Sequence, residues 1–127
     1  YLSRLELKDN DIAVFIDIDD FKIFNDTYGH DAGDQLLVEF VKILREAKDE
    51  DLVIVRYGGD DFVIVLKNTV EVSVPLLMAH VKEALVTHFT DADFSYGYVK
   101  YTGELAETLI QADHQMYQMK RKRSKEQ

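Results

Sequence analysis

Two apolar runs joined by a short glycine-containing turn place the strongest limit on how this chain can fold. Val53–Val55 precedes the turn and Phe62–Leu66 follows it, with Gly58 and Gly59 between them. Runs of this length that are rich in β-branched residues and bounded by turn residues are typical of a β-hairpin. Glycine supplies the positive φ angles that tight turns use. We therefore expect a hairpin over residues 52–66.

Two adjacent carboxylates, Asp60 and Asp61, follow the glycines of this turn. A backbone that turns sharply and carries crowded negative charge is suited to holding a polyphosphate through divalent metal ions. Charged turns are also common on protein surfaces. The turn on its own therefore leaves a solvated loop as an open alternative.

A second acidic cluster follows the apolar run Ile12–Ile16, which has the pattern of a strand buried on both faces. Asp17, Asp19 and Asp20 come directly after it. Carboxylates at the end of a buried strand repel one another and lose hydration, and Mg²⁺ would relieve both effects. Asp19 and Asp20 have an alternative role as caps of the following helix, whereas Asp17 lies at the strand end itself.

The remaining segments complete an alternating pattern. We expect helices near residues 20–27, 34–47 and 104–121, a helix with Pro75 in its first turn, and a strand at 94–101 in which Gly97 permits a close contact. The buried stripe of the Pro75 helix is expected at Leu76, Leu77, Val81, Ala84, Leu85 and Phe89, and Leu2, Leu5 and Leu7 are expected in the end of a helix. The order indicates an α/β sandwich of the split βαβ type, with a mostly antiparallel sheet.

Composition narrows the possible functions. The chain of 127 residues has the length of a single domain, and its net charge of −9 argues against a nucleic-acid-binding surface. No apolar run approaches the roughly 20 residues of a membrane span, and no signal peptide is present. The absence of cysteine fits a cytoplasmic protein or the cytoplasmic side of a membrane-anchored sensor. Tyr1 is not a natural start, so we expect a fragment of a longer protein.

The motifs and their order resemble the GGDEF family of diguanylate cyclases over nearly the whole chain. The matching residues are Asp17-Ile18-Asp19-Asp20-Phe21-Lys22, Asn25-Asp26, Gly29-His30, Gly33-Asp34 and Arg56-Tyr57-Gly58-Gly59-Asp60-Asp61-Phe62. The resemblance implies a ferredoxin-like, palm-type sheet flanked by helices, as in nucleotide cyclases. It also implies that residues 1–127 form one catalytic domain, with a truncated N-terminal helix and an upstream sensory or dimerisation segment.

The implied activity is the condensation of two GTP molecules into cyclic di-GMP, a bacterial second messenger, with release of two pyrophosphates. The 3′-hydroxyl of one GTP attacks the α-phosphate of the other, assisted by two Mg²⁺ or Mn²⁺ ions. By resemblance, Asp17 and the carbonyl of Ile18 bind metal, and Asp60 binds metal and helps to deprotonate the 3′-hydroxyl. Asp61 occupies the second acidic position and supports metal binding. Because each domain offers one GTP site, the resemblance also implies a catalytic homodimer.

The resemblance assigns phosphate contacts to two lysines and to backbone groups. Lys22 and Lys120 are expected to contact the triphosphate. Phe21 and Lys22 stand at the start of a helix, where their backbone N–H groups can donate to phosphate. The backbone at Gly58 and Gly59 is expected close to the nucleotide. Each lysine has the alternative of an ordinary solvated charge.

The resemblance assigns guanine recognition to Asn25 and Asp34, with His30 lining the pocket. A carboxylate can accept from guanine N1 and N2, and an amide can donate to O6 or N7. The alternatives are a turn residue for Asn25, a helix N-cap for Asp34 and a loop histidine for His30.

The chain departs from the family pattern in several places. Asp61 stands where the family has glutamate, and its shorter side chain is expected to loosen metal geometry and lower turnover. Residues 49–52 lack the Arg-x-x-Asp of the product-inhibition site, so we expect no such site. The basic run Lys120–Lys125 replaces Lys-x-x-Gly-Arg-Asn, and it is either a solvated tail or a substitute phosphate contact. The family's N-terminal Asp-x-Leu-Thr-Gly-Leu-x-Asn-Arg element is absent.

Three other functions remain compatible with the sequence. The domain could be a degenerate relative that binds GTP as a sensor or protein-interaction module. It could act on a different nucleotide, although the acidic surface disfavours a polymerase. It could also be a structural domain that binds divalent ions and has no affinity for nucleotides.

Overall fold

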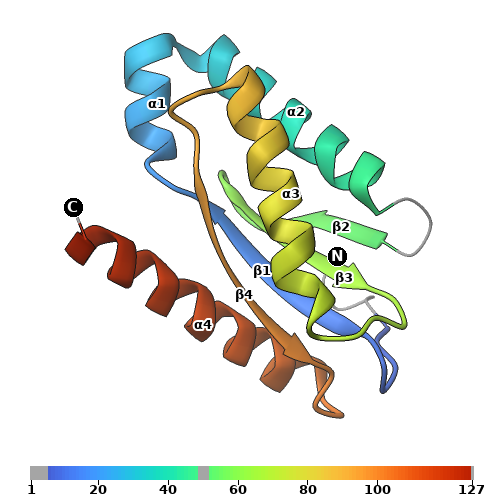
Figure 1. Cartoon of the computed structure of the whole chain (residues 1–127). Coiled ribbons are helices and arrows are strands. Elements are labelled where there is room, and N and C mark those ends of the chain that lie inside the picture. The colour runs from blue at the N-terminus through green and yellow to red at the C-terminus, as the bar shows by residue number, and fades with distance from the viewer. Residues whose placement is uncertain (1–5, 49–51, 127) are drawn as a thin grey trace.

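The computed structural model describes residues 6–48 and 52–126, which form a four-stranded sheet with helices on both faces (Figure 1). In chain order the elements are β1 (Ile12–Ile18), α1 (Phe21–Tyr28), α2 (His30–Ala47), β2 (Leu52–Arg56), β3 (Asp61–Leu66), α3 (Ser73–His88), β4 (Phe94–Lys100) and α4 (Leu105–Glu126). None of the helices in this described part of the chain is long and apolar enough to cross a membrane.

The strand order is β2-β3-β1-β4, and every neighbouring pair is antiparallel. β2 and β3 form the expected hairpin, with Leu52 opposite Leu66 and Arg56 opposite Phe62. β3 therefore separates β1 from β2, which is the split βαβ arrangement. The expected ferredoxin-like, palm-type α+β fold is confirmed.

Both faces of the sheet are covered, so β1 is buried along its whole length, as its continuous apolar run predicts. Ile12, Val14 and Ile16 point into the core on the α2 and α3 side. Phe15 points the other way, into a smaller core that includes Ala112 of α4. Figure 1 shows α4 on one side of the sheet and α2 and α3 on the other. The carboxyl end of β1 consequently lies under helices on both sides.

α4 rests directly on the backbone of β4 at Gly97. A Cβ atom added at Gly97 would lie 2.2 Å from the carbonyl oxygen of Ala112 and 2.4 Å from the backbone nitrogen of Met116. Glycine is therefore needed here for the close approach of a helix to a strand. The predicted contact at Gly97 is confirmed, and it sets the position of α4.

α2 begins four residues earlier than expected, at His30 rather than Asp34. Gly29 precedes it with φ 95° and ψ 161°, a conformation that suits glycine, and the N–H of Gly33 donates to the Gly29 carbonyl. Asp34 thus lies inside the helix, and its alternative role as an N-cap is wrong.

The predicted stripe of α3 is largely confirmed, and Pro75 does lie in the first turn of the helix. Val81 and Leu85 are buried, and Leu77, Ala84 and Phe89 pack against the core. Leu76 is 74% exposed instead of buried, and Val74 and Met78 are buried although the pattern did not single them out. At the other end of the chain, Leu7 lies in irregular backbone rather than in a helix, and Leu2 and Leu5 fall outside the described residues.

Candidate active site

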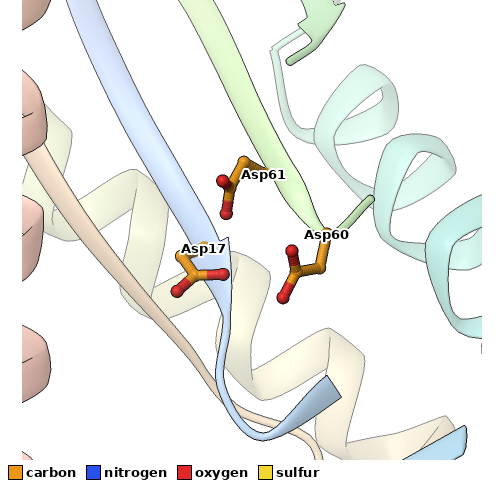
Figure 2. A group of neighbouring side chains, drawn as sticks. All are labelled: Asp17, Asp60 and Asp61. Atoms are coloured by element: carbon orange, nitrogen blue, oxygen red, sulfur yellow. The ribbon is translucent and has the colours of Figure 1, made fainter. Parts of the chain in front are cut away.

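The carboxylates of Asp17, Asp60 and Asp61 converge at one end of the sheet (Figure 2). Asp17 near the end of β1 lies directly opposite Asp61 at the start of β3, and the N–H of Ile18 donates to the Asp60 carbonyl at 3.1 Å. One carboxylate oxygen from each aspartate lies within 4.8 Å of the other two. The central pairing of β1 with β3 therefore joins two motifs that are far apart in the sequence.

Burial and mutual repulsion make this cluster unfavourable without a counter-charge. Asp17 is only 5% exposed, and burial, together with the adjacent carboxylate of Asp61, raises its pKa despite the opposing Lys120. Burial and the nearby charge of Asp17 likewise raise the pKa of Asp60. The Oδ1 atom of Asp17 is buried and has no hydrogen-bond partner in the protein.

Part of the counter-charge comes from Lys120 on α4, whose ammonium group forms an ion pair with Oδ2 of Asp17. Burial lowers the pKa of Lys120, but its hydrogen bond to Asp17 and the charges of Asp19 and Asp60 outweigh this and raise it. The lysine therefore stays cationic beside the cluster. Because Lys120 occupies Oδ2, a ligand of Asp17 has Oδ1 left to engage.

The cluster has the chemistry of a site for hard divalent cations. Such ions prefer carboxylate and carbonyl oxygens, and three aspartates with an unpartnered buried oxygen supply that donor set. The residues present thus fit the expected metal. Ile18, whose carbonyl the resemblance assigns to metal binding, follows Asp17 directly. Aspartate at position 61 is long enough to bring its carboxylate into the group.

The turn before β3 is held by Arg56, a contact that the sequence analysis did not identify. Its Nε donates to the Gly58 carbonyl at 3.2 Å and its Nη2 donates to the Gly59 carbonyl at 2.6 Å. The N–H of Tyr57 also donates to the Asp61 carbonyl at 2.8 Å. These contacts fix the exposed glycines next to the carboxylates.

α1 begins two residues after β1, with Asp20 at its N-cap position. Asp20 adopts the left-handed conformation (φ 55°, ψ 33°), and its side chain makes no capping hydrogen bond. The carboxylate of Asp19 instead accepts from Ser95 and Arg123. Asp20 thus occupies the N-cap position without capping through its carboxylate, and the first-turn N–H groups of Phe21 and Lys22 have no side-chain cap from Asp20.

Asn25 lies on α1 against α2, and its Oδ1 is buried without a hydrogen-bond partner. A Cβ atom added at Gly33 would lie 1.7 Å from that oxygen, so the absence of a side chain at Gly33 leaves room for the amide. Asp34 follows Gly33 on the exposed side of α2, and His30 is exposed in its first turn. The fold therefore brings Asn25 next to the residue before Asp34, while His30 lies one turn earlier.

Arg123 is a second contact that the sequence analysis missed. Its guanidinium group forms ion pairs at 2.9 Å with both Asp19 and Asp93, and it donates to the Phe94 carbonyl. The solvated-tail alternative is therefore wrong for Arg123, and a phosphate contact stays a prediction. The acidic segment Asp49–Asp51, which bears on product inhibition, lies outside the described residues.

The comparison with protein families agrees with this fold. Residues 2–126 match the family described as diguanylate cyclase, GGDEF domain. The chain belongs to the GGDEF family. The GGDEF chain is 31% identical over 126 residues to diguanylate cyclase DgcS of Shewanella oneidensis, covering 94% of this chain and 42% of that protein. It is 32% identical over 124 residues to diguanylate cyclase DgcP of Escherichia coli K12, covering 90% and 36%. The chain thus spans about two fifths of the length of these relatives.

Solved structures place the chain in the same group. The active GGEEF domain of a diguanylate cyclase from Vibrio cholerae matches with a TM-score of 0.78 and 27% identity, over 88% of this chain and 77% of that one. Diguanylate cyclase SiaD of Pseudomonas aeruginosa, solved in complex with its activator SiaC, matches with a TM-score of 0.79 and 25% identity, over 90% and 47%. These likenesses agree with a GGDEF domain over almost all of the chain.

Proposed function

We propose that this GGDEF domain is a diguanylate cyclase that joins two GTP molecules into cyclic di-GMP and releases two pyrophosphates. The observation that carries the proposal is the convergence of Asp17, Asp60 and Asp61, with an unpartnered oxygen on the most buried of them. The relatives named diguanylate cyclase support the same activity.

The chemistry is a nucleotidyl transfer. The 3′-hydroxyl oxygen of one GTP forms a bond to the α-phosphorus of the other, and the bond from that phosphorus to the bridging oxygen of pyrophosphate breaks. Asp60 is a partly exposed member of the cluster, and its carboxylate would accept the hydroxyl proton. Divalent ions held by Asp17, Asp60, Asp61 and the Ile18 carbonyl, Mg²⁺ or Mn²⁺, would polarise the phosphate and neutralise the leaving group.

The remaining residues would bind the nucleotide. The N–H groups of Phe21 and Lys22 open α1 and suit a phosphate, since helix N-termini attract anions. The side chains of Lys22 and Lys120 would add positive charge, and the exposed backbone at Gly58 and Gly59 would lie close to the nucleotide. On the α1–α2 side, Asn25 and Asp34 would recognise guanine, with His30 at the pocket rim.

The proposal is tested by incubating the chain with GTP and Mg²⁺ and measuring cyclic di-GMP and pyrophosphate. We expect Asp60→Asn to lower the rate by about 10²–10⁴-fold, the range for removal of a general base. Asp113→Asn, the same change at an exposed position on α4, is the matched control and should keep full activity. GTP turnover that Asp60→Asn leaves intact would contradict the assignment.

A second candidate, a GTP-binding relative without turnover, is favoured by one observation. Lys120 already neutralises Asp17 within the protein, which lessens the need of the cluster for a metal ion. Tight GTP binding without pyrophosphate release would support this candidate over the cyclase. Comparison with ATP in the same assay tests the choice of base.

A further inference from the structure

Arg123 connects α4 to the two strands that border it through three contacts. Its guanidinium pairs with Oδ2 of Asp19, just after β1, and with Oδ1 of Asp93, just before β4, each at 2.9 Å. It also donates to the Phe94 carbonyl. Planar guanidinium groups suit this kind of several-point recognition, which a lysine ammonium cannot reproduce. The side chain of Arg123 is 29% exposed, so these pairs are partly shielded from water.

The carboxylates that receive Arg123 are themselves fixed. Ser95, which is fully buried in β4, donates to the second oxygen of Asp19 at 2.8 Å. Asp93 accepts from the N–H of Phe94 at 2.8 Å and pairs with Lys82 of α3 at 3.2 Å. Arg123 therefore pairs with two carboxylates whose positions are already held by other hydrogen bonds and ion pairs.

Lys120 and Arg123 lie three residues apart on α4, and their partners Asp17 and Asp19 lie two residues apart at the end of β1. Side chains three apart share a helix face, so α4 meets this stretch of β1 through two parallel ion pairs. The two pairs differ in one respect. Asp17 belongs to the carboxylate cluster, whereas Asp19 and Asp93 lie outside it.

We propose that Arg123 is a positioning residue, which keeps the last turns of α4 over the cluster while Lys120 exchanges Asp17 for substrate phosphate. This inference rests on the proposed function, in which Asp17 binds metal and Lys120 meets the triphosphate. When Asp17 takes up a cation, the ion pair between Lys120 and Asp17 is weakened. The contacts of Arg123 persist at that moment, because none of its partners is a cluster member.

The alternative role for Arg123 is direct contact with phosphate. Substitution of Asp93 distinguishes this role from the positioning role. As a positioning residue, Arg123 needs Asp93, so Asp93→Asn should weaken GTP use in the same direction as Arg123→Ala. As a phosphate ligand, Arg123 would be released by Asp93→Asn, and GTP use would stay equal or improve.

The first measurement needs no nucleotide. Urea unfolding of Arg123→Ala, Asp93→Asn and the double variant forms a double-mutant cycle. If the two residues interact, the folding equilibrium constant of the double variant should exceed the value expected from independent single losses by about threefold or more. Independent losses would overturn the contact. Arg121→Ala is the matched control, because that arginine lies over Tyr117, 6.0 Å from its ring centroid, rather than at the acids.

The second measurement is steady-state GTP turnover. We expect Arg123→Ala to raise KM by about tenfold and Asp93→Asn to raise it by about threefold, with smaller changes in kcat. Arg123→Lys should restore only part of the loss. Arg121→Ala should match the wild type. In a Lys120→Ala background, Arg123→Ala should have little further effect, since it acts through Lys120. Equal losses in both backgrounds, or Asp93→Asn with unchanged KM, would overturn the positioning role.

The two measurements also separate this inference from the proposed function. A wild-type chain that neither binds nor converts GTP would overturn the cyclase proposal and the positioning role together, whatever the unfolding cycle gives. A chain that converts GTP but fails either test on Arg123 would overturn this inference alone.

Discussion

Two buried aspartates show how the partners of a carboxylate decide its behaviour. Asp17 faces other carboxylates and has an oxygen without a donor, and burial together with Asp61 raises its pKa. Asp11, at the opposite end of β1, is as deeply buried but accepts from the N–H groups of Lys8 and Asn68, each at 2.9 Å. Burial alone would raise the pKa of Asp11, yet these bonds and Lys67 outweigh it and lower the pKa. We interpret Asp17 as a functional group and Asp11 as a structural one.

Asp11→Asn should destabilise the domain by about 1–3 kcal/mol at neutral pH, because an amide cannot accept hydrogen bonds at both positions. The pKa of Asp11 lies below its ordinary 3.8 in the folded chain, so its contribution is complete above that value and fades as the pH falls through the folded pKa. The gap between wild type and variant in urea unfolding should therefore narrow from pH 7 to about pH 3.

The exposed neighbour Asp9 gives the control for this experiment. Asp9→Asn should leave the free energy of unfolding within about 0.5 kcal/mol of the wild type. A gap for Asp11→Asn that stays constant or widens in acid would contradict the assignment.

Gly33→Ala should impair guanine recognition without unfolding the domain. The new methyl group would lie 1.7 Å from Oδ1 of Asn25, a movable side-chain atom, so the amide is displaced rather than the helix. Alanine also suits a helix interior better than glycine, by about 1 kcal/mol. We expect GTP affinity to fall to that of Asn25→Ala, with a thermal midpoint no lower than that of the wild type.

The double variant of Gly33→Ala with Asn25→Ala supplies the check, because a methyl group that acts only through Asn25 has no effect once the amide is gone. GTP affinities that multiply in the double variant would show that Gly33 acts in another way.

Local patterns predict the place of each cluster aspartate in its element, since one follows an apolar strand and two close a hairpin turn, but their proximity depends on the pairing of β1 with β3. The contacts of Arg123 were not predictable in this way. Arg123 meets Asp19 across 104 residues and Phe94 across 29, and these meetings depend on the rotation of α4 over the sheet. Nothing in the basic run itself specifies that rotation.

At the scale of elements, the position of α4 is set by the absence of a side chain at Gly97 in β4. The strand offers a backbone surface at Gly97, and the helix backbone rests on it around Ala112 and Met116. The glycine in a run of alternating residues did predict a close contact, because it leaves a gap in the side-chain pattern. The start of α2 was missed, since Gly29 lies at a helix end, where local patterns are weakest.

Gly97→Ala should cost about 1–3 kcal/mol of stability or more, because its methyl group meets backbone atoms at 2.2 and 2.4 Å that cannot turn aside. Urea unfolding measures the loss. Gly59→Ala is the control for stability, because a Cβ atom there meets nothing within 4 Å. Equal midpoints for Gly97→Ala and wild type would show that α4 can lift off β4 at no cost.

At the scale of the whole molecule, the fold gathers one carboxylate cluster per chain among the described residues. The split βαβ topology was predictable because the order of elements and the single hairpin leave few arrangements of an antiparallel sheet. The proposed reaction, however, makes two linkages. We therefore propose that two domains face each other, each presenting one GTP.

Initial rates should then rise with nearly the square of enzyme concentration below the dimer dissociation constant, and linearly above it. Rates measured over a dilution series, with the oligomeric state followed in parallel, check this dependence. Strict proportionality across the whole range would contradict a dimeric catalyst.

The seat of α4 on Gly97 has a mechanical consequence. At Gly97 no side chain separates the backbone of α4 from the strand, and this contact holds the helix in register along β4. A signal that activates or inhibits this domain would then change the side-chain contacts of the carboxylates or move α1 and α2. During that change, α4 would keep its position on the sheet.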